Sequence, residues 1–121
     1  MKILLYGIPA ETAGRIAARH GFEVTASLDE KGGAAGAMLA IPPIASPGQL
    51  LSLYNTLITR EDEIDAVIVG EANHCDAYDT IRYGSPQGKF FTLSGDEETL
   101  EYEFERIVES LLGLLCAHEG I

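Results

Sequence analysis

Residues 71–79 hold the densest group of reactive side chains in the sequence, directly after an apolar run. The group consists of Glu71, Asn73, His74, Cys75, Asp76 and Asp79. A cysteine close to a helix N-terminus has its thiolate favoured by the helix dipole, and a neighbouring histidine can serve as its base. The pattern therefore offers Cys75, His74 and Asp76 as catalytic candidates, with Cys75 as nucleophile and His74 as base of a small hydrolase or thiol-redox enzyme.

The same residues allow two other interpretations. His74 together with Glu71, Cys75 or Asp76 could bind a metal, although adjacent residues seldom all point at one ion and the four-ligand spacing of zinc sites is missing. Alternatively, Asn73 caps a helix and Asp76 lies favourably in its first turn. We favour this structural interpretation and assign no metal site, and the sequence identifies no cofactor.

The opening segment has the order of a dinucleotide-binding unit, with an apolar run up to Gly7, a turn, a helix and an acid at Asp29. That fingerprint needs glycines where the backbone meets the pyrophosphate. Here Pro9 and Thr12 stand at the second and third glycine positions. Because proline adds bulk and removes a donor, the sequence predicts an ordinary turn between a strand and a helix.

Apolar runs alternate with helix signals along the whole chain. The runs predict strands at 2–7, 22–27, 37–41, 64–70 and 89–93, and helices at 9–21, at 47–59, over a short segment that ends at Gly84, and from 97 onward, with a glycine-rich loop at 28–36. We expect one α/β domain over 1–121. It has three layers and a mainly parallel sheet of four or five strands, Rossmann-like or flavodoxin-like, flanked by about four helices.

The connection between the strands at 22–27 and 37–41 is short. Two parallel strands are usually joined by a crossover of a dozen or more residues. We therefore expect that the strand at 37–41 does not run parallel to the strand before it.

Ligands of open α/β sheets bind in the crevice outside the carboxyl ends of the strands. The loops that follow the predicted strands are 7–12, 42–47, 70–76 and 94–97. The ligand-binding candidates on these loops are Gly7, Pro9, Pro42, Ser46, Gly70, Glu71, Asn73 and Ser94.

Charge is distributed unevenly along the 121 residues, whose net charge is −11. Residues 1–60 hold five basic and four acidic side chains, a balance of +1, whereas 61–121 hold three and fifteen, a balance of −12. No Lys/Arg cluster is present, which argues against nucleic acid as a partner. In the final helix, glutamates recur every four residues and could face a basic protein partner: Glu97, Glu101, Glu105 and Glu109.

The location of the protein is inferred from its apolar runs and its cysteines. No run approaches the roughly 20 residues of a membrane span. Cys75 and Cys116 lie far apart and match no metal-finger or redox spacing, as expected for reduced thiols in the cytoplasm, and a disulfide between them stays open as an alternative. A homodimer is an assembly that small α/β domains adopt often.

These observations favour a non-catalytic cytoplasmic module that binds a small ligand or regulates a partner, because the loops form a good scaffold without a complete catalytic set. Two alternatives stay open. One is the thiol-dependent enzyme built on Cys75 and His74, and the other is an acidic subunit that docks on a larger complex.

Overall fold

Five parallel strands form one sheet in the computed structural model, in the order β2-β3-β1-β4-β5. The structure describes residues 1–30, 32–41, 46–70, 75–84, 90–93 and 97–119, and of 75–78, 97 and 114–119 only the backbone. The strands are β1 (Lys2–Tyr6), β2 (Phe22–Thr25), β3 (Gly36–Ile41), β4 (Ala66–Val69) and β5 (Phe90–Thr92). The helices are α1 (Ala10–His20), α2 (Pro47–Thr59), α3 (Cys75–Gly84) and α4 (Glu97–Glu119), with a short 3₁₀ turn, η1, at Glu61–Glu63. The predicted α/β fold with a mainly parallel sheet is confirmed.

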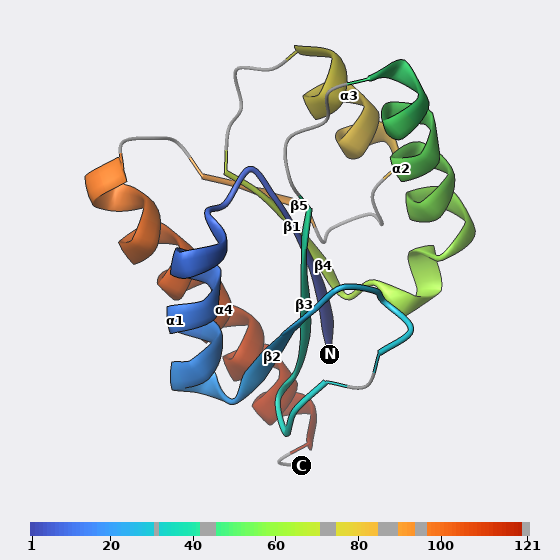
Figure 1. Cartoon of the computed structure of the whole chain (residues 1–121). Helices are drawn as coiled ribbons and strands as arrows, with labels where there is room; N and C mark the ends of the chain where they lie inside the picture. The colour runs from blue at the N-terminus through green and yellow to red at the C-terminus, as the bar shows by residue number, and fades with distance from the viewer. Residues whose placement is uncertain (31, 42–45, 71–74, 85–89, 94–96, 120–121) are drawn as a thin grey trace.

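β1 is the middle strand, with β3 and β2 on one side of it and β4 and β5 on the other. The order of β3, β1, β4 and β5 is that of a flavodoxin-like sheet, and β2 is added at the edge beyond β3. α1 and α4 cover one face of the sheet, while α2 and α3 cover the other (Figure 1). The switch point therefore lies between β1 and β4.

Each face of the sheet has its own apolar core, because successive side chains of a strand point to opposite faces. Ile3 and Leu5 of β1 pack toward α1 and α4, together with Phe104 of α4. Leu4 and Tyr6 pack toward α2 and α3. All four residues of β4 are buried, as the continuous apolar run predicted.

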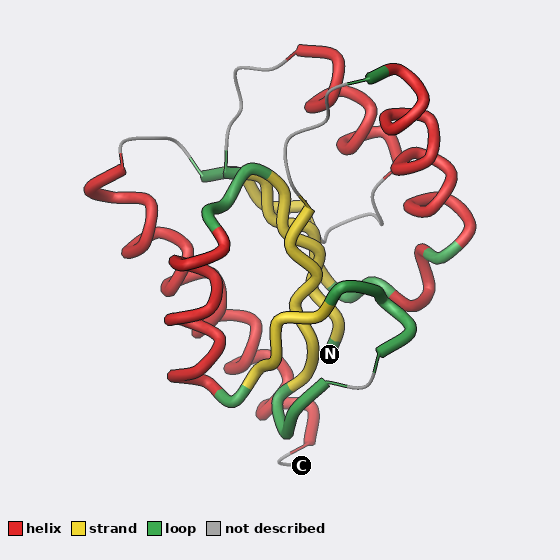
Figure 2. Tube along the Cα trace, viewed as in Figure 1, coloured by secondary structure: helices red, strands yellow, loops and turns green. Residues whose placement is uncertain are grey.

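The prediction that β3 is not parallel to β2 is wrong. The two strands pair in parallel, from Phe22 with Gly36 to Thr25 with Leu39, and the described residues between them, 26–30 and 32–35, form no helix (Figure 2). Leu28 of this connection is 2 % exposed and belongs to the core on the α2/α3 face. Ten residues can span far more than the length of a four-residue strand. The buried side chain of Leu28 thus attaches this connection to the core, where two parallel strands usually have a crossover helix between them.

Arg60 holds the same connection from the side of η1. Its guanidinium donates to Asp29 Oδ1 at 2.7 Å and also to the Glu63 carboxylate. The hydrogen bond with Glu63 raises the pKa of Arg60 above its already high ordinary value, desolvation lowers it by less, and the attraction of Asp29 adds a smaller rise. Arg60 therefore stays charged at every physiological pH and ties the connection to the turn before β4.

The helix boundaries follow the capping signals of the sequence. Ser46 is the N-cap of α2, where its hydroxyl accepts from the backbone N–H of Gln49 at 3.3 Å. α1 begins after Pro9 and ends at Gly21, whose left-handed backbone (φ 79°) lets its N–H donate to the Ala17 carbonyl. Within the described residues, no helix has both the length and the apolar character needed to cross a bilayer.

Truncation of Leu28 tests its role as the anchor of the β2–β3 connection. We expect Leu28→Ala to lower the free energy of unfolding by about 2–5 kcal/mol, because it empties a buried site in the core. Val24→Ala is the matched control, since Val24 lies on the edge strand with 43 % of its surface exposed. Urea denaturation measures both variants, and an equal loss in the two would contradict the anchoring role.

Candidate functional site

The carboxyl ends of β1 and β4 lie side by side at the switch point. Tyr6 pairs with Val69 in the parallel register, and the Gly70 N–H donates to the Tyr6 carbonyl at 2.7 Å. The Leu93 N–H in turn donates to the Val69 carbonyl at 2.8 Å. The segments that leave β1, β4 and β5 therefore start from one edge of the sheet.

At this edge the backbones leaving β1 and β4 approach each other closely. Gly7 has a φ of 74°, which favours glycine. A Cβ added to Gly70 would lie 2.8 Å from the Gly7 carbonyl oxygen and 3.0 Å from Cγ1 of Ile8. The two glycines thus let the backbones pack together at the floor of the candidate site.

Four of the eight predicted ligand-binding residues lie within the described part of the chain. Gly7 and Gly70 come together as predicted from their strands. Pro9 is exposed at the N-cap of α1, and Ser46 is exposed at the start of α2, where its hydroxyl caps the helix. The other four fall outside the described residues: Pro42, Glu71, Asn73 and Ser94.

The catalytic candidates stay predictions. Cys75 and Asp76 are the first two residues of α3, but their side chains lie outside the described part of the structure, as does the whole of His74. Asp79, one turn further along α3, is exposed. A helix does begin at the cysteine, as the sequence predicted.

A second group of charged side chains joins α1 to α4, and the sequence analysis did not find it. Arg15 pairs with Glu101 at 3.1 Å, and Arg19 pairs with Glu105 at 2.7 Å. His20 Nε2 lies 3.6 Å from Glu105 Oε1. Glu101 and Glu105 of the final helix thus have basic partners on α1. Arg15 and Arg19 are four residues apart, as are Glu101 and Glu105, and this matching spacing was the available signal for the two ion pairs. Only the fold shows that α1 and α4 are neighbours.

Comparisons with known proteins assign no function to either group. No family model matches the chain, and no curated protein or solved structure matches it.

A methyl group at Gly70 tests the close approach of the two strand ends. We expect Gly70→Ala to cost roughly 1–3 kcal/mol of folding free energy, because the new Cβ meets the backbone of Gly7. Gly14→Ala is the control, since a Cβ there meets nothing within 4 Å and should stabilise α1 by roughly 0.5–1 kcal/mol. Thermal unfolding measures the stability of both variants. An unchanged stability of Gly70→Ala would show that the ends of β1 and β4 are further apart than 2.8 Å from Cβ to carbonyl oxygen.

Proposed function

We propose that the protein is a non-catalytic cytoplasmic module that binds a small molecule at the carboxyl edge of the sheet, between the ends of β1 and β4, and serves in regulation. The observation that carries the proposal is the switch point itself. Helices leave the two neighbouring strands toward opposite faces at this point, and ligands of open α/β sheets bind in the crevice so formed.

The chemistry of the described edge residues supports binding. Gly7, Ile8, Pro9 and Gly70 bring backbone groups and apolar surface to the edge, and none of these four carries an acid, a base or a nucleophile. α1 begins at Ala10, so the unpaired N–H groups of its first turn point toward the same edge. Such an arrangement suits a ligand with an anionic or hydrogen-bond-accepting group.

A basic protein partner receives less support from the same structure. Glu101 and Glu105, two members of the predicted docking stripe, are already paired with Arg15 and Arg19 of α1. A partner would have to compete with these ion pairs. We therefore place the small molecule ahead of the protein partner.

The thiol-dependent enzyme is the second candidate function, and one observation favours it. Cys75 is the first residue of α3, where the helix dipole favours a thiolate. As a hydrolase it would pass the Cys75 proton to His74 and attack the carbonyl carbon of an ester or amide, forming a thioester while the alcohol or amine leaves with that proton. Water would then cleave the thioester and restore the thiol.

Binding at the edge is tested by two-dimensional ¹H–¹⁵N NMR with AMP and with a dicarboxylic acid as anionic probes. We expect shifts concentrated at 7–12, at Gly70 and at Leu93. Ala10→Glu places a negative charge at the start of α1 and should weaken binding by about tenfold or more. Ala18→Glu is the control, because Ala18 is also exposed on α1 but near its other end. The proposal would be contradicted by shifts elsewhere in the chain, by the absence of shifts with both probes, or by equal effects of Ala10→Glu and Ala18→Glu on binding.

Alkylation of Cys75 separates the two candidate functions. In a Cys116→Ser background, the rate of reaction with iodoacetamide is followed against pH. The helix dipole at the start of α3 favours the thiolate under either proposal, so the midpoint is compared with that of a His74→Ala variant, and under the binding proposal we expect the two midpoints to be equal. A midpoint that moves to clearly higher pH in His74→Ala would favour the enzyme instead, because its thiolate is paired with His74.

A further inference from the structure

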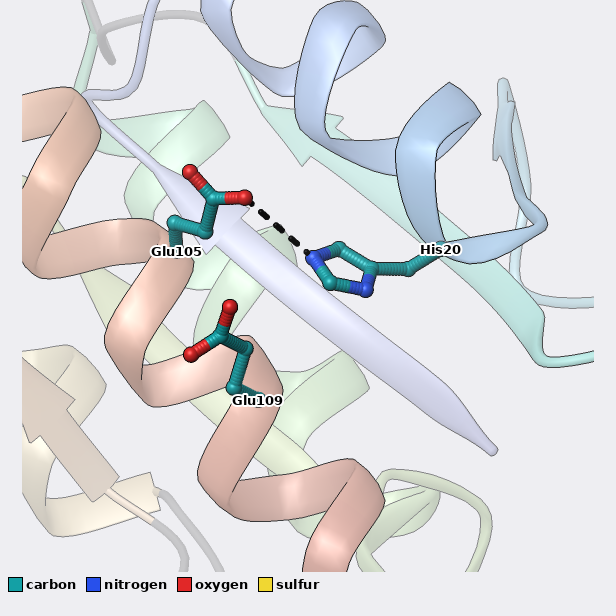
Figure 3. Close-up of side chains that lie close together, drawn as sticks. All are labelled: His20, Glu105 and Glu109. Atoms are coloured by element: carbon teal, nitrogen blue, oxygen red, sulfur yellow. Dashed lines mark ion pairs between the residues drawn. The ribbon is translucent and has the colours of Figure 1, made fainter.

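His20 ends α1 and faces two glutamates of α4 (Figure 3). Glu105 and Glu109 lie one turn apart on α4, so both carboxylates are on the side that the histidine approaches. One ligand atom from each of the three side chains lies within 4.8 Å of the other two. Imidazole nitrogen and carboxylate oxygen are both donors that divalent metals bind.

The imidazole nitrogen that faces the carboxylates is buried without a hydrogen bond. His20 Nε2 has no hydrogen-bond partner in the described part of the chain, and its side chain is only 18 % exposed. Its distance of 3.6 Å to Glu105 Oε1 is too long for a hydrogen bond. A buried polar atom left unpaired is costly, so this nitrogen has free capacity to bind a ligand.

Arg19 positions one of the carboxylates. Its Nη1 donates to Glu105 Oε2 at 2.7 Å, which leaves Oε1 directed at His20. Carboxylates that bind metals are commonly oriented in this way by a hydrogen bond to their second oxygen. The ion pair therefore prepares Glu105 as a ligand.

The local charge also favours a cation. Glu101 and Glu105 are paired with Arg15 and Arg19, whereas Glu109 has no ion pair within the described residues, which leaves one uncompensated carboxylate beside His20. His20 lies at the C-terminal end of α1, where the partial negative charge of the helix attracts positive charge.

We propose that His20 Nε2, Glu105 and Glu109 form a binding site for a divalent transition-metal ion, with water completing the coordination. Ligands at about 2.1 Å from a tetrahedral ion lie roughly 3.4 Å apart, close to the separation of His20 and Glu105. Glu109 is exposed, so its side chain can rotate inward to close the site. The bound ion links the end of α1 to the middle of α4.

This site is distinct from the proposed ligand-binding edge. α1 starts at that edge and ends at His20, about 15 Å further along its axis. Failure of either proposal therefore leaves the other intact.

Paramagnetic broadening by Mn²⁺ locates the site. Mn²⁺ is a suitable probe because it is paramagnetic and prefers oxygen donors such as carboxylates to thiols. We expect amide signals near His20 and Glu105–Glu109 to broaden first. Glu109→Gln and His20→Gln should each weaken binding by about tenfold or more. Glu98→Gln is the control, since Glu98 is an exposed carboxylate of the same helix outside the cluster and its removal changes the net charge equally.

The comparison of variants decides between a defined site and general attraction to an acidic helix. Equal weakening by Glu98→Gln and Glu109→Gln would mean that the ion is attracted by charge alone. Unchanged binding in His20→Gln, or no broadening at His20 in the natural sequence, would mean that His20 and Glu105 form a simple ion pair. Each of these results would overturn the proposal.

Discussion

The parallel pairing of β1 with a neighbour on each side is the constraint on which the rest of the structure depends. β1 is hydrogen-bonded along its length to β3 and to β4, and all its residues from Ile3 to Tyr6 are buried. A strand in that position must supply apolar side chains to both faces of the sheet. The sequence of β1 does so, and the two cores then recruit α1 and α4 to one face and α2 and α3 to the other.

This division of the helices connects the fold to the proposed function. The chain leaves β1 toward one face of the sheet and β4 toward the other, and the proposed site lies where these two strand ends meet. Gly7 and Gly70 allow the backbones to touch there. The other end of α1 carries a different chemistry, where His20 and the glutamates of α4 come together. α1 thus begins at the proposed ligand-binding edge and ends at the proposed metal site.

Much of the fold could be predicted from local signals, whereas the contacts between distant segments could not. Ser46 before Pro47, and Gly21 after α1, set helix boundaries through hydrogen bonds to their own neighbours in sequence. The connection that leads to the parallel β3 contains Leu28 instead, which is buried in a core assembled from other parts of the chain. The pairing of Arg19 with Glu105 spans 86 positions and needs two helices to pack on one face. Such contacts follow from the sheet order, which no local pattern contains.

The proposed binding site requires that the carboxyl ends of β1 and β4 lie side by side. Scalar coupling across hydrogen bonds, measured in a long-range HNCO spectrum, reports which carbonyl accepts from which amide. We predict a correlation between the Gly70 nitrogen and the Tyr6 carbonyl carbon, whose hydrogen bond is 2.7 Å long. A correlation from Gly70 to any other carbonyl would contradict the sheet order and remove the edge on which the proposed binding site is built.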